Sequence, residues 1–317
     1  MGTAYISHAD CQRHDTGEGH PENARRLTAI EDRFIVTGLF DVLSRIDAPE
    51  VTEEQLLRIH TRHHLDTVSS MTPVSGYARL DPDTVISRDS LIAARRAAGA
   101  VVAAVDLVVG GEMESAFCGI RPPGHHAETN RAMGFCLYNN IAIGAAHALE
   151  RHGLIKVAIV DFDVHQGNGT EEAFQDDNRV LFCSTFQHPF YPFTAQLDNS
   201  PNRVNVPLDA TAQSAEFRAA VTDHWLPALQ DFQPQMIFVS AGFDAHRDDE
   251  MSNVSLTDND FQWVTEQIVE IAAESALGRI VSVLEGGYEL NSLARCVETH
   301  VRTLMGLQTK LPGVMPY

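Results

Sequence analysis

Four short apolar runs, each rich in β-branched residues, alternate in the second half of the chain with segments of helical pattern. The runs are KVAIV (156–160), RVLFCS (179–184), QMIFVSAG (235–242) and RIVSVLEGG (279–287). Apolar residues recur at helical spacing in segments 91–111, 140–153, 170–175 and 261–278. This alternation predicts the α/β class, with a mostly parallel sheet that is flanked by helices on both faces.

Polar side chains follow three of the predicted strands. The motifs are DFDVH (161–165), FDAH (243–246) and EGGY (285–288). Ligands of open α/β sheets bind beyond the carboxyl ends of the strands, so we expect the three motifs to meet there. Ordinary turn residues explain a single Asp after a strand well, but explain all three motifs poorly.

The motif DFDVH places two carboxylates and an imidazole at alternate positions. Residues i, i+2 and i+4 of a strand share one face, so Asp161, Asp163 and His165 can point the same way. Asp163 and His165 together with Asp244 form a set that suits a catalytic zinc ion, and also iron(II), cobalt or manganese. A hydrogen-bonded Asp–His pair explains the same spacing, and the spacing alone leaves both interpretations open.

A histidine pair, His125 and His126, lies in RPPGHHAE (121–128), where Pro-Pro-Gly predicts an irregular, rigid loop. MGFCLYNN (133–140) follows closely. A second pair, His63 and His64, has no Gly/Pro frame and lies in a segment of helical pattern. We interpret the second pair as surface or packing residues and the first as a candidate for chemistry.

Long motifs in this chain resemble the signature blocks of the zinc-dependent histone deacetylase family. They are GHPENARRL (19–27), RPPGHHA (121–127), MGFCLYNN (133–140), DFDVHQGNGT (161–170), GFDAH (242–246) and EGGYEL (285–290). The matches run in family order from residue 19 to about 296. Asn168, where the first class usually carries Asp, indicates the class II branch and its bacterial relatives, the histone deacetylase-like amidohydrolases.

The resemblance implies the arginase/deacetylase α/β fold in a single domain over residues 1–317, with the active site at the carboxyl ends of the strands. It implies a zinc-dependent hydrolase of acyl amides, with one Zn²⁺ per chain. The expected substrate is an N-acetyl-lysine side chain of a peptide or protein. Deacetylation of an acetylated polyamine on the same fold is the alternative.

The resemblance also implies roles for individual residues. The zinc ligands are Asp163, His165 and Asp244. His126 is the general base and acid, and His125 beside it gives electrostatic support. Asp161 orients His125, Asn168 orients His126, and Tyr288 donates a hydrogen bond to the developing oxyanion.

Further residues are assigned by the resemblance to substrate and potassium. Those expected to bind substrate in the channel are Gly134, Phe135, Tyr191 and Met251. A structural K⁺ would be bound by Asp161 and Ser184, and a second K⁺ by the carbonyls of Phe174, Asp177 and Val180.

Substrate choice is expected to depend on the gate seven residues after the third zinc ligand. Polyamine-selective relatives resemble one another in having a glutamate there, whereas this chain has Met251, with Glu250 one place away. An apolar gate favours acetyl-lysine. Asp248, Asp249 and Glu250 are expected to form an acidic rim or a solvated loop.

Three other residues of these motifs have more ordinary interpretations. Arg26 lies either at the bottom of the channel or in a surface salt bridge. Cys136 is expected to pack beneath the site, and His246 to be a supporting or loop residue.

Composition limits the possible partners. The 317 residues are 44% hydrophobic and 21% charged, and the formal net charge is −20. This charge disfavours nucleic acid and favours cationic ligands. No window approaches an uninterrupted membrane span, and the N-terminal sequence lacks the features of a secretory signal. Five cysteines without a CxxC motif predict a cytoplasmic protein with reduced thiols, and a homo-oligomer stays open.

Two other functions fit the fold. A binuclear manganese ureohydrolase needs a further carboxylate two residues after the histidine, where this chain has Gly167. An inactive acyl-lysine reader is expected to lack the tyrosine, the histidine pair or a ligand, and this chain retains all of them.

Overall fold

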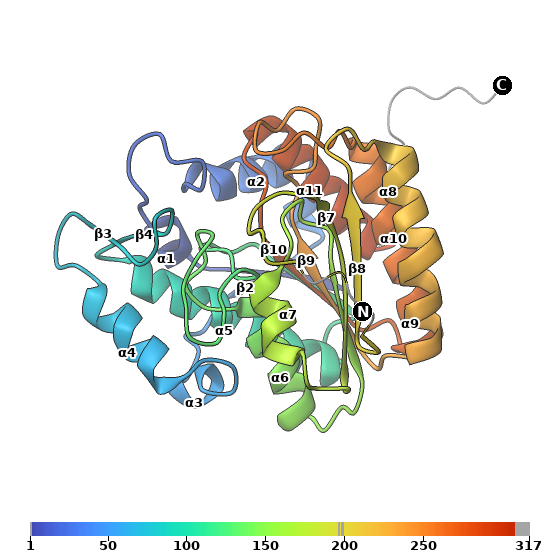
Figure 1. Ribbon diagram of the computed structural model, residues 1–317, viewed down its shortest axis with the longest axis horizontal. Coiled ribbons are helices and arrows are strands. Elements are labelled where there is room, and N and C mark those ends of the chain that lie inside the picture. The colour runs from blue at the N-terminus through green and yellow to red at the C-terminus, as the bar shows by residue number, and fades with distance from the viewer. Residues whose placement is uncertain (1, 196, 198–199, 308–317) are drawn as a thin grey trace.

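The structure is a computed structural model that describes residues 2–195, 197 and 200–307 (Figure 1). Its centre is an eight-stranded sheet in the order β2-β1-β5-β10-β9-β6-β7-β8, in which every neighbouring pair is parallel. The strands are β1 Thr3–Ser7, β2 Ser44–Asp47, β5 Ser115–Cys118, β6 Val157–Asp161, β7 Val180–Gln187, β8 Arg203–Leu208, β9 Ile237–Ala241 and β10 Ile280–Leu284. A separate antiparallel pair is formed by β3 Tyr77–Arg79 and β4 Val85–Ser87.

Helices cover both faces of the sheet (Figure 1). On one side α5 and α6 pack against each other and against the central strands. On the other side α11 packs between α2 and α10. The helices are α1 Ala9–Gln12, α2 Arg25–Val36, α3 Glu53–Leu56, α4 Arg62–Met71, α5 Ser90–Val109, α6 Asn140–Glu150, α7 Asn168–Phe174, α8 Ser214–Ala220, α9 Leu226–Phe232, α10 Asp258–Ser275 and α11 Leu290–Leu304, with a 3₁₀ turn at Leu39–Asp41 and a π turn at Val221–Trp225.

The four predicted strands are the core of this sheet. β6, β7, β9 and β10 are buried at every position, which is why their sequences are continuous apolar runs. The four predicted helical segments correspond to α5, α6, α7 and α10. The predicted α/β class and mostly parallel sheet are therefore confirmed. That residues 1–317 form one domain stays a prediction.

The sheet order brings the three polar motifs together. β10, β9 and β6 are adjacent, and Ala241 pairs with Leu284 while Ser240 pairs with Asp161. The loops that leave these strands therefore begin side by side at one edge of the sheet. They carry Asp163 and His165, Asp244, and Tyr288, as expected from the carboxyl ends of parallel strands.

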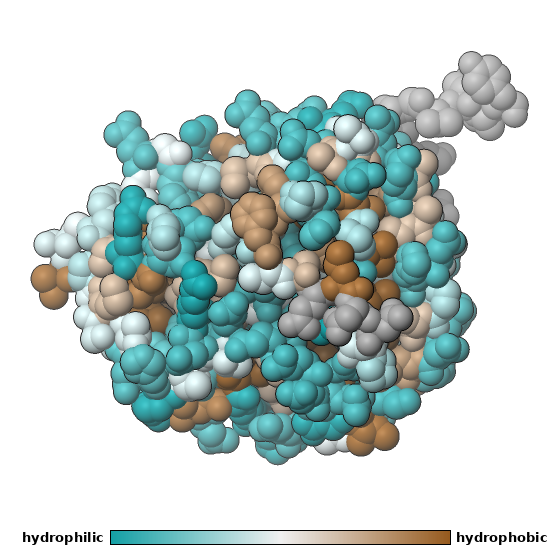
Figure 2. Space-filling model, viewed as in Figure 1, coloured by the Kyte–Doolittle hydropathy of each residue, from teal (hydrophilic) through white to brown (hydrophobic). Residues whose placement is uncertain are grey.

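The surface has few large apolar areas on the face shown in Figure 2, where apolar residues are scattered among polar ones. Among the described residues no helix is long and apolar enough to cross a membrane. All five cysteines are free and buried, as expected for thiols that serve as small core residues.

Candidate metal centre and active site

Asp163, His165 and Asp244 converge at the carboxyl ends of β6 and β9. The Nδ1 atom of His165 lies 3.1 Å from Asp163 Oδ1 and 3.1 Å from Asp244 Oδ2, and all three residues are buried. A Cβ atom at Gly286 would overlap the carboxylates of Asp163 and Asp244. Only glycine therefore allows the backbone after β10 to pass so close to them. A buried imidazole nitrogen between two carboxylates fits a divalent metal ion, because the ion would take the place of the Nδ1 proton.

Two further groups of potential metal ligands occur among the described residues: His246 with Asp258 and Cys296, and Asp106 with His147 and His152. In each group the Nδ1 atom of one histidine already accepts a hydrogen bond. The backbone N–H of Asp248 donates to His246 Nδ1 (3.1 Å), and Arg58 donates to His147 Nδ1 (2.7 Å). The neutral rings must then carry their protons on Nε2, which faces the carboxylate, so no lone pair remains for a metal ion.

The hydrogen bonds of His126 determine its tautomer. Its Nδ1 lies 2.8 Å from Asn168 Oδ1, and the Nδ2 of the same amide donates to Glu128 Oε1 (2.9 Å). Because Glu128 fixes the orientation of the amide, the Nδ1–H of His126 donates to Asn168. The lone pair of a neutral His126 is therefore on Nε2. Burial, followed by the nearby His125 and His165, lowers the pKa of His126 well below its ordinary value, which keeps the ring neutral.

His125 has the opposite electrostatic environment. Its Nδ1 lies 3.0 Å from Asp161 Oδ2. Burial by itself would lower the pKa of His125, but the charges of Asp161 and Asp163 raise it to about 10. The two adjacent imidazoles, with ring centroids 4.0 Å apart, thus differ in charge. Such a separation of pKa values is typical of acid–base sites.

A cavity of about 230 Å³ leads to these groups. It is lined by Asp83, Pro123, His125, His126, Gly134, Phe135, His165, Phe190, Tyr191, Met251, Gly286 and Tyr288. The lining includes all four residues that were expected to bind substrate: Gly134, Phe135, Tyr191 and Met251. Gly134 has φ +57°, and a Cβ atom there would overlap the His126 ring. Phe190 stacks on His165 with centroids 5.3 Å apart, a contact that the sequence did not suggest.

Arg26 lies beneath Tyr288, not in a surface salt bridge. The arginine is fully buried, its guanidinium is 4.9 Å from the centroid of the Tyr288 ring, and its Nε donates to Gly287 O (2.6 Å). Burial raises the pKa of the Tyr288 phenol well above its ordinary value. The phenol is therefore a protonated hydrogen-bond donor throughout the neutral pH range.

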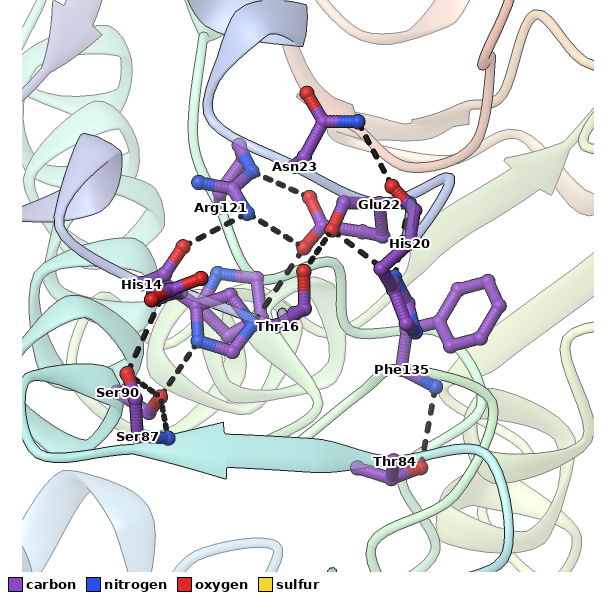
Figure 3. A network of polar contacts seen from close by, with 12 residues as sticks. His14, Thr16, His20, Glu22, Asn23, Thr84, Ser87, Ser90, Arg121 and Phe135 are labelled. Carbon is purple, nitrogen blue, oxygen red and sulfur yellow. Dashed lines mark hydrogen bonds and ion pairs between the residues drawn. The ribbon is translucent and has the colours of Figure 1, made fainter. Parts of the chain in front are cut away.

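A buried carboxylate, Glu22, links the N-terminal motif to the active-site loops (Figure 3). Both of its oxygens contact the Arg121 guanidinium, and Oε1 also contacts Arg26 Nη1 (3.2 Å). Arg121 opens the loop that carries the histidine pair. Figure 3 also shows His20 beside Phe135 of the cavity wall, with ring centroids 4.7 Å apart.

Glu285 makes a second link between these loops. Its Oε2 accepts hydrogen bonds from the backbone N–H groups of Gly124 (2.7 Å) and His125 (3.1 Å). The first residue of the EGGY motif therefore holds the backbone of the histidine pair, a function that was not assigned from the sequence.

The predicted acidic rim is wrong for Asp249. Asp249 is buried, whereas Asp248 is exposed and contacts Arg295 (3.5 Å). Burial of Asp249 depends on backbone donors from another loop, which composition does not reveal. Cys136 is buried, and His246 contacts Asp258 (3.2 Å), as expected for packing and supporting residues.

The expected potassium ligands differ in how well they fit an ion. Ser184 Oγ is buried and has no hydrogen-bond partner among the described residues, and Ser184 pairs with Asp161 across β6 and β7. At the second expected site, the carbonyls of Phe174 (2.9 Å) and Asp177 (3.4 Å) accept hydrogen bonds from Asn202 Nδ2. The first site suits a cation, whereas a side-chain amide occupies the second.

Comparison with known proteins matches residues 20–304 to the histone deacetylase domain. The chain belongs to the histone deacetylase family. It is 36% identical to the histone deacetylase-like amidohydrolase of Pseudomonas aeruginosa, over 91% of this chain and 77% of that protein. It is 37% identical to the human polyamine deacetylase HDAC10, over 96% of this chain but only 48% of the human protein.

The crystal structure of the HDA15 HD domain is similar to this structure, with a TM-score of 0.91 and 32% sequence identity over 98% of this chain and 91% of that chain. The arginase/deacetylase fold and the family resemblance are therefore confirmed. Membership of the histone deacetylase family makes the protein a deacetylase-type hydrolase.

Proposed function

We propose that this family member is a zinc-dependent amidohydrolase that removes acetyl groups from N-acetyl-lysine side chains. The observation that carries the proposal is the position of a neutral histidine beside a three-residue metal-ligand set. The rings of His126 and His165 have centroids 5.9 Å apart, and the free lone pair of His126 is on Nε2. Hydrolysis of an amide needs both an electrophilic activator and a general base.

The ligands for zinc would be Asp163, His165 and Asp244. A zinc ion bound by them would polarise the acyl carbonyl and lower the pKa of the attacking water. His126 Nε2 takes the proton of that water and returns it to the departing amine. His125, positively charged beside Asp161, stabilises negative charge that develops next to it.

Tyr288 and the cavity walls would orient the substrate. The Tyr288 hydroxyl, protonated because of burial, donates a hydrogen bond to the oxygen of the tetrahedral intermediate. Phe135, with Tyr288 at a centroid distance of 6.1 Å, and Tyr191, at 5.1 Å from His126, form apolar walls for an aliphatic chain. Gly134 allows the wall to approach His126, and Met251 forms the gate.

Deacetylation of a polyamine is the second candidate, because the human relative is named a polyamine deacetylase. Against this, the gate position has Met251, which offers no charge to the distant ammonium of a polyamine. We therefore rank acetyl-lysine first.

Three finer assignments accompany the proposal. One K⁺ would bind at Asp161 and Ser184, where the unpartnered hydroxyl supports it. Asn168 supports the class II branch. Five free buried thiols support a location in the cytoplasm. One continuous sheet, with strands from Thr3 to Leu284, supports a single domain of residues 1–317.

The test is a substrate panel with metal-free protein reconstituted with Zn²⁺. We expect hydrolysis of acetyl-lysine peptides, loss of activity on chelation, and return of activity when Zn²⁺ is restored. Asp163→Ala and Asp244→Ala should each lose the ion, because each removes one of three ligands. The control is Asp106→Ala, which removes a carboxylate from the potential ligand group of Asp106, His147 and His152. Arg58 already donates a hydrogen bond to His147 in that group, so this variant should keep its zinc ion.

The proposal fails if chelated protein retains full activity. It also fails if both ligand variants still bind one zinc ion tightly. Activity on acetylated polyamines alone would favour the second candidate.

A further inference from the structure

Asp249 is a buried carboxylate in the loop between β9 and α10, and no catalytic role has been assigned to it. The residue is 5% exposed, although Asp248 and Glu250 on either side of it are exposed. A buried carboxylate is unfavourable unless hydrogen bonds satisfy its oxygens. The donors that reach Asp249 therefore indicate what the residue does.

Both oxygens of Asp249 accept hydrogen bonds from the backbone of cavity-lining loops. Oδ2 accepts from the N–H groups of Tyr288 (2.6 Å) and Glu289 (3.0 Å). Oδ1 accepts from the N–H group of Met251 (3.0 Å). Hydrogen bonds to an ionised carboxylate are stronger than neutral ones. One side chain thus joins the loop of the tyrosine to the loop of the gate.

The loop that carries Asp249 is itself anchored. The backbone N–H of Asp249 donates to His246 O (2.9 Å), and His246 contacts Asp258 at the start of α10. In the same loop, Ser252 Oγ donates to Asp244 O (2.9 Å). Asp249 is therefore a fixed point relative to the metal ligand Asp244.

The tyrosine loop is held before Tyr288 by hydrogen bonds of its two glycines. The N–H of Gly286 donates to Asp163 Oδ2 (2.8 Å), and Arg26 Nε donates to Gly287 O (2.6 Å). Tyr288 follows Gly286 and Gly287, and Gly287 has φ +117°, a conformation that side-chain-bearing residues rarely adopt. These contacts stop at Gly287, and the next two N–H groups, those of Tyr288 and Glu289, both donate to Asp249 Oδ2. Arg26 therefore supports the Tyr288 ring and the backbone before it, and Asp249 supports the backbone at Tyr288 itself.

We propose that Asp249 is a positioning residue that fixes the backbone of Tyr288, and with it the reach of the phenol, while holding Met251 at the gate. The proposal rests on the deacetylase function proposed above. Misplacement of a catalytic group by about 1 Å can reduce a rate by about 100-fold. Removal of Asp249 should therefore lower kcat while leaving the metal ligands in place.

The kinetic test is a double-mutant cycle between Asp249→Ala and Tyr288→Phe. Asp249→Ala alone should lower kcat for an acetyl-lysine peptide by about 100-fold and retain one zinc ion per chain. In the Tyr288→Phe background the same change should cost no more than about threefold, because the hydroxyl that it positions is already gone. Asp248→Asn, which removes the neighbouring exposed charge, should leave kcat unchanged.

A second measurement is independent of activity. Hydrogen exchange of a peptide spanning residues 285–292 should be faster in Asp249→Ala than in wild type, since the N–H groups of Tyr288 and Glu289 lose their acceptor. Asp249→Asn keeps one oxygen as an acceptor, so its kcat and its exchange should be intermediate. If Asp249→Ala does not fold, Asp249→Asn is used in its place for both measurements.

The proposal is overturned by equal losses of kcat in the two backgrounds, by loss of zinc from Asp249→Ala, or by unchanged exchange in the 285–292 peptide. A wild-type protein that hydrolyses nothing in the substrate panel would refute the proposed function instead. The exchange experiment would still show whether Asp249 anchors the loop.

Discussion

The Tyr288 hydroxyl is the single group whose removal should separate catalysis most clearly from folding. We expect Tyr288→Phe to lower kcat by about 100- to 1,000-fold, because it removes the donor that we propose acts on the oxyanion. The melting temperature and zinc content should stay at wild-type values. The measurement is steady-state kinetics on an acetyl-lysine peptide with metal analysis of the same samples.

The matched control for this substitution is Tyr5→Phe. The Tyr5 hydroxyl donates to Glu31 (3.1 Å), and the residue does not line the cavity. This control loses a comparable hydroxyl and should keep its turnover. Near-normal kcat in Tyr288→Phe would contradict the oxyanion role.

Single residues differ in how well the sequence reveals them. Asp163 and His165 stood out as candidates because carboxylates and imidazoles are rare at the ends of apolar strands, and the pair at His125 stood out through its Pro-Pro-Gly frame. Their individual roles came from the family resemblance and stay predictions. Asp249 and Asp83 lie in acidic, turn-like stretches that look the same as a solvated loop. What distinguishes Asp249 is a hydrogen bond to Tyr288, 39 residues away, and sequence spacing carries no sign of such a contact.

At the scale of elements, the Glu22 cluster links the N-terminal segment before α2 to the loops of the histidine pair and the tyrosine. Burial alone would raise the pKa of Glu22, but Arg121, His14 and Arg26 lower it to about 2. Because the pKa of Glu22 is lower in the folded protein than in the unfolded chain, the ionised carboxylate stabilises the fold above about pH 4.5. This stabilisation is lost as the pH falls towards about 2. The shift corresponds to about 3 kcal/mol.

Glu22→Gln should therefore lower the free energy of unfolding at pH 7 by about 3–5 kcal/mol, because two buried guanidinium groups lose their counter-charge. Its stability should also fall less than that of wild type as the pH is lowered from about 5 to about 3. Urea unfolding at several pH values measures both effects. Glu18→Gln, at an exposed position, is the control. Parallel pH curves for wild type and Glu22→Gln would contradict the prediction.

Elements were predictable where burial is uniform. β6, β7, β9 and β10 are apolar runs because helices cover both of their faces. The edge strand β2 (SRID) alternates between half-buried and exposed positions, and β5 (SAFC) has only four residues. β5 is stabilised by pairing with β1 and β10, both more than a hundred residues away, and no local pattern reports that pairing.

At the scale of the whole molecule, the net charge of −20 attracts an acetylated polyamine and also an acetyl-lysine peptide with basic neighbouring residues, so it does not by itself identify the acetylated side chain that is hydrolysed. Attraction of this kind is screened beyond about 8 Å at physiological salt. We therefore propose that the gate selects the substrate. Met251 lines the cavity, whereas Glu250 is exposed and is not part of its lining.

We therefore expect a higher kcat/KM for an acetyl-lysine peptide than for N8-acetylspermidine. Met251→Glu should shift the ratio towards the polyamine by about tenfold, because a carboxylate at the gate can pair with the distant ammonium. Met251→Leu, which keeps the gate apolar, should leave the ratio unchanged, and so should Glu250→Gln. A wild-type preference of tenfold or more for the polyamine, lost in Glu250→Gln but kept in Met251→Leu, would show that Glu250 is the gate. Raising the salt from about 20 to about 200 mM should weaken kcat/KM for the polyamine in every variant, since the charge of the whole molecule acts at long range while the gate acts by contact.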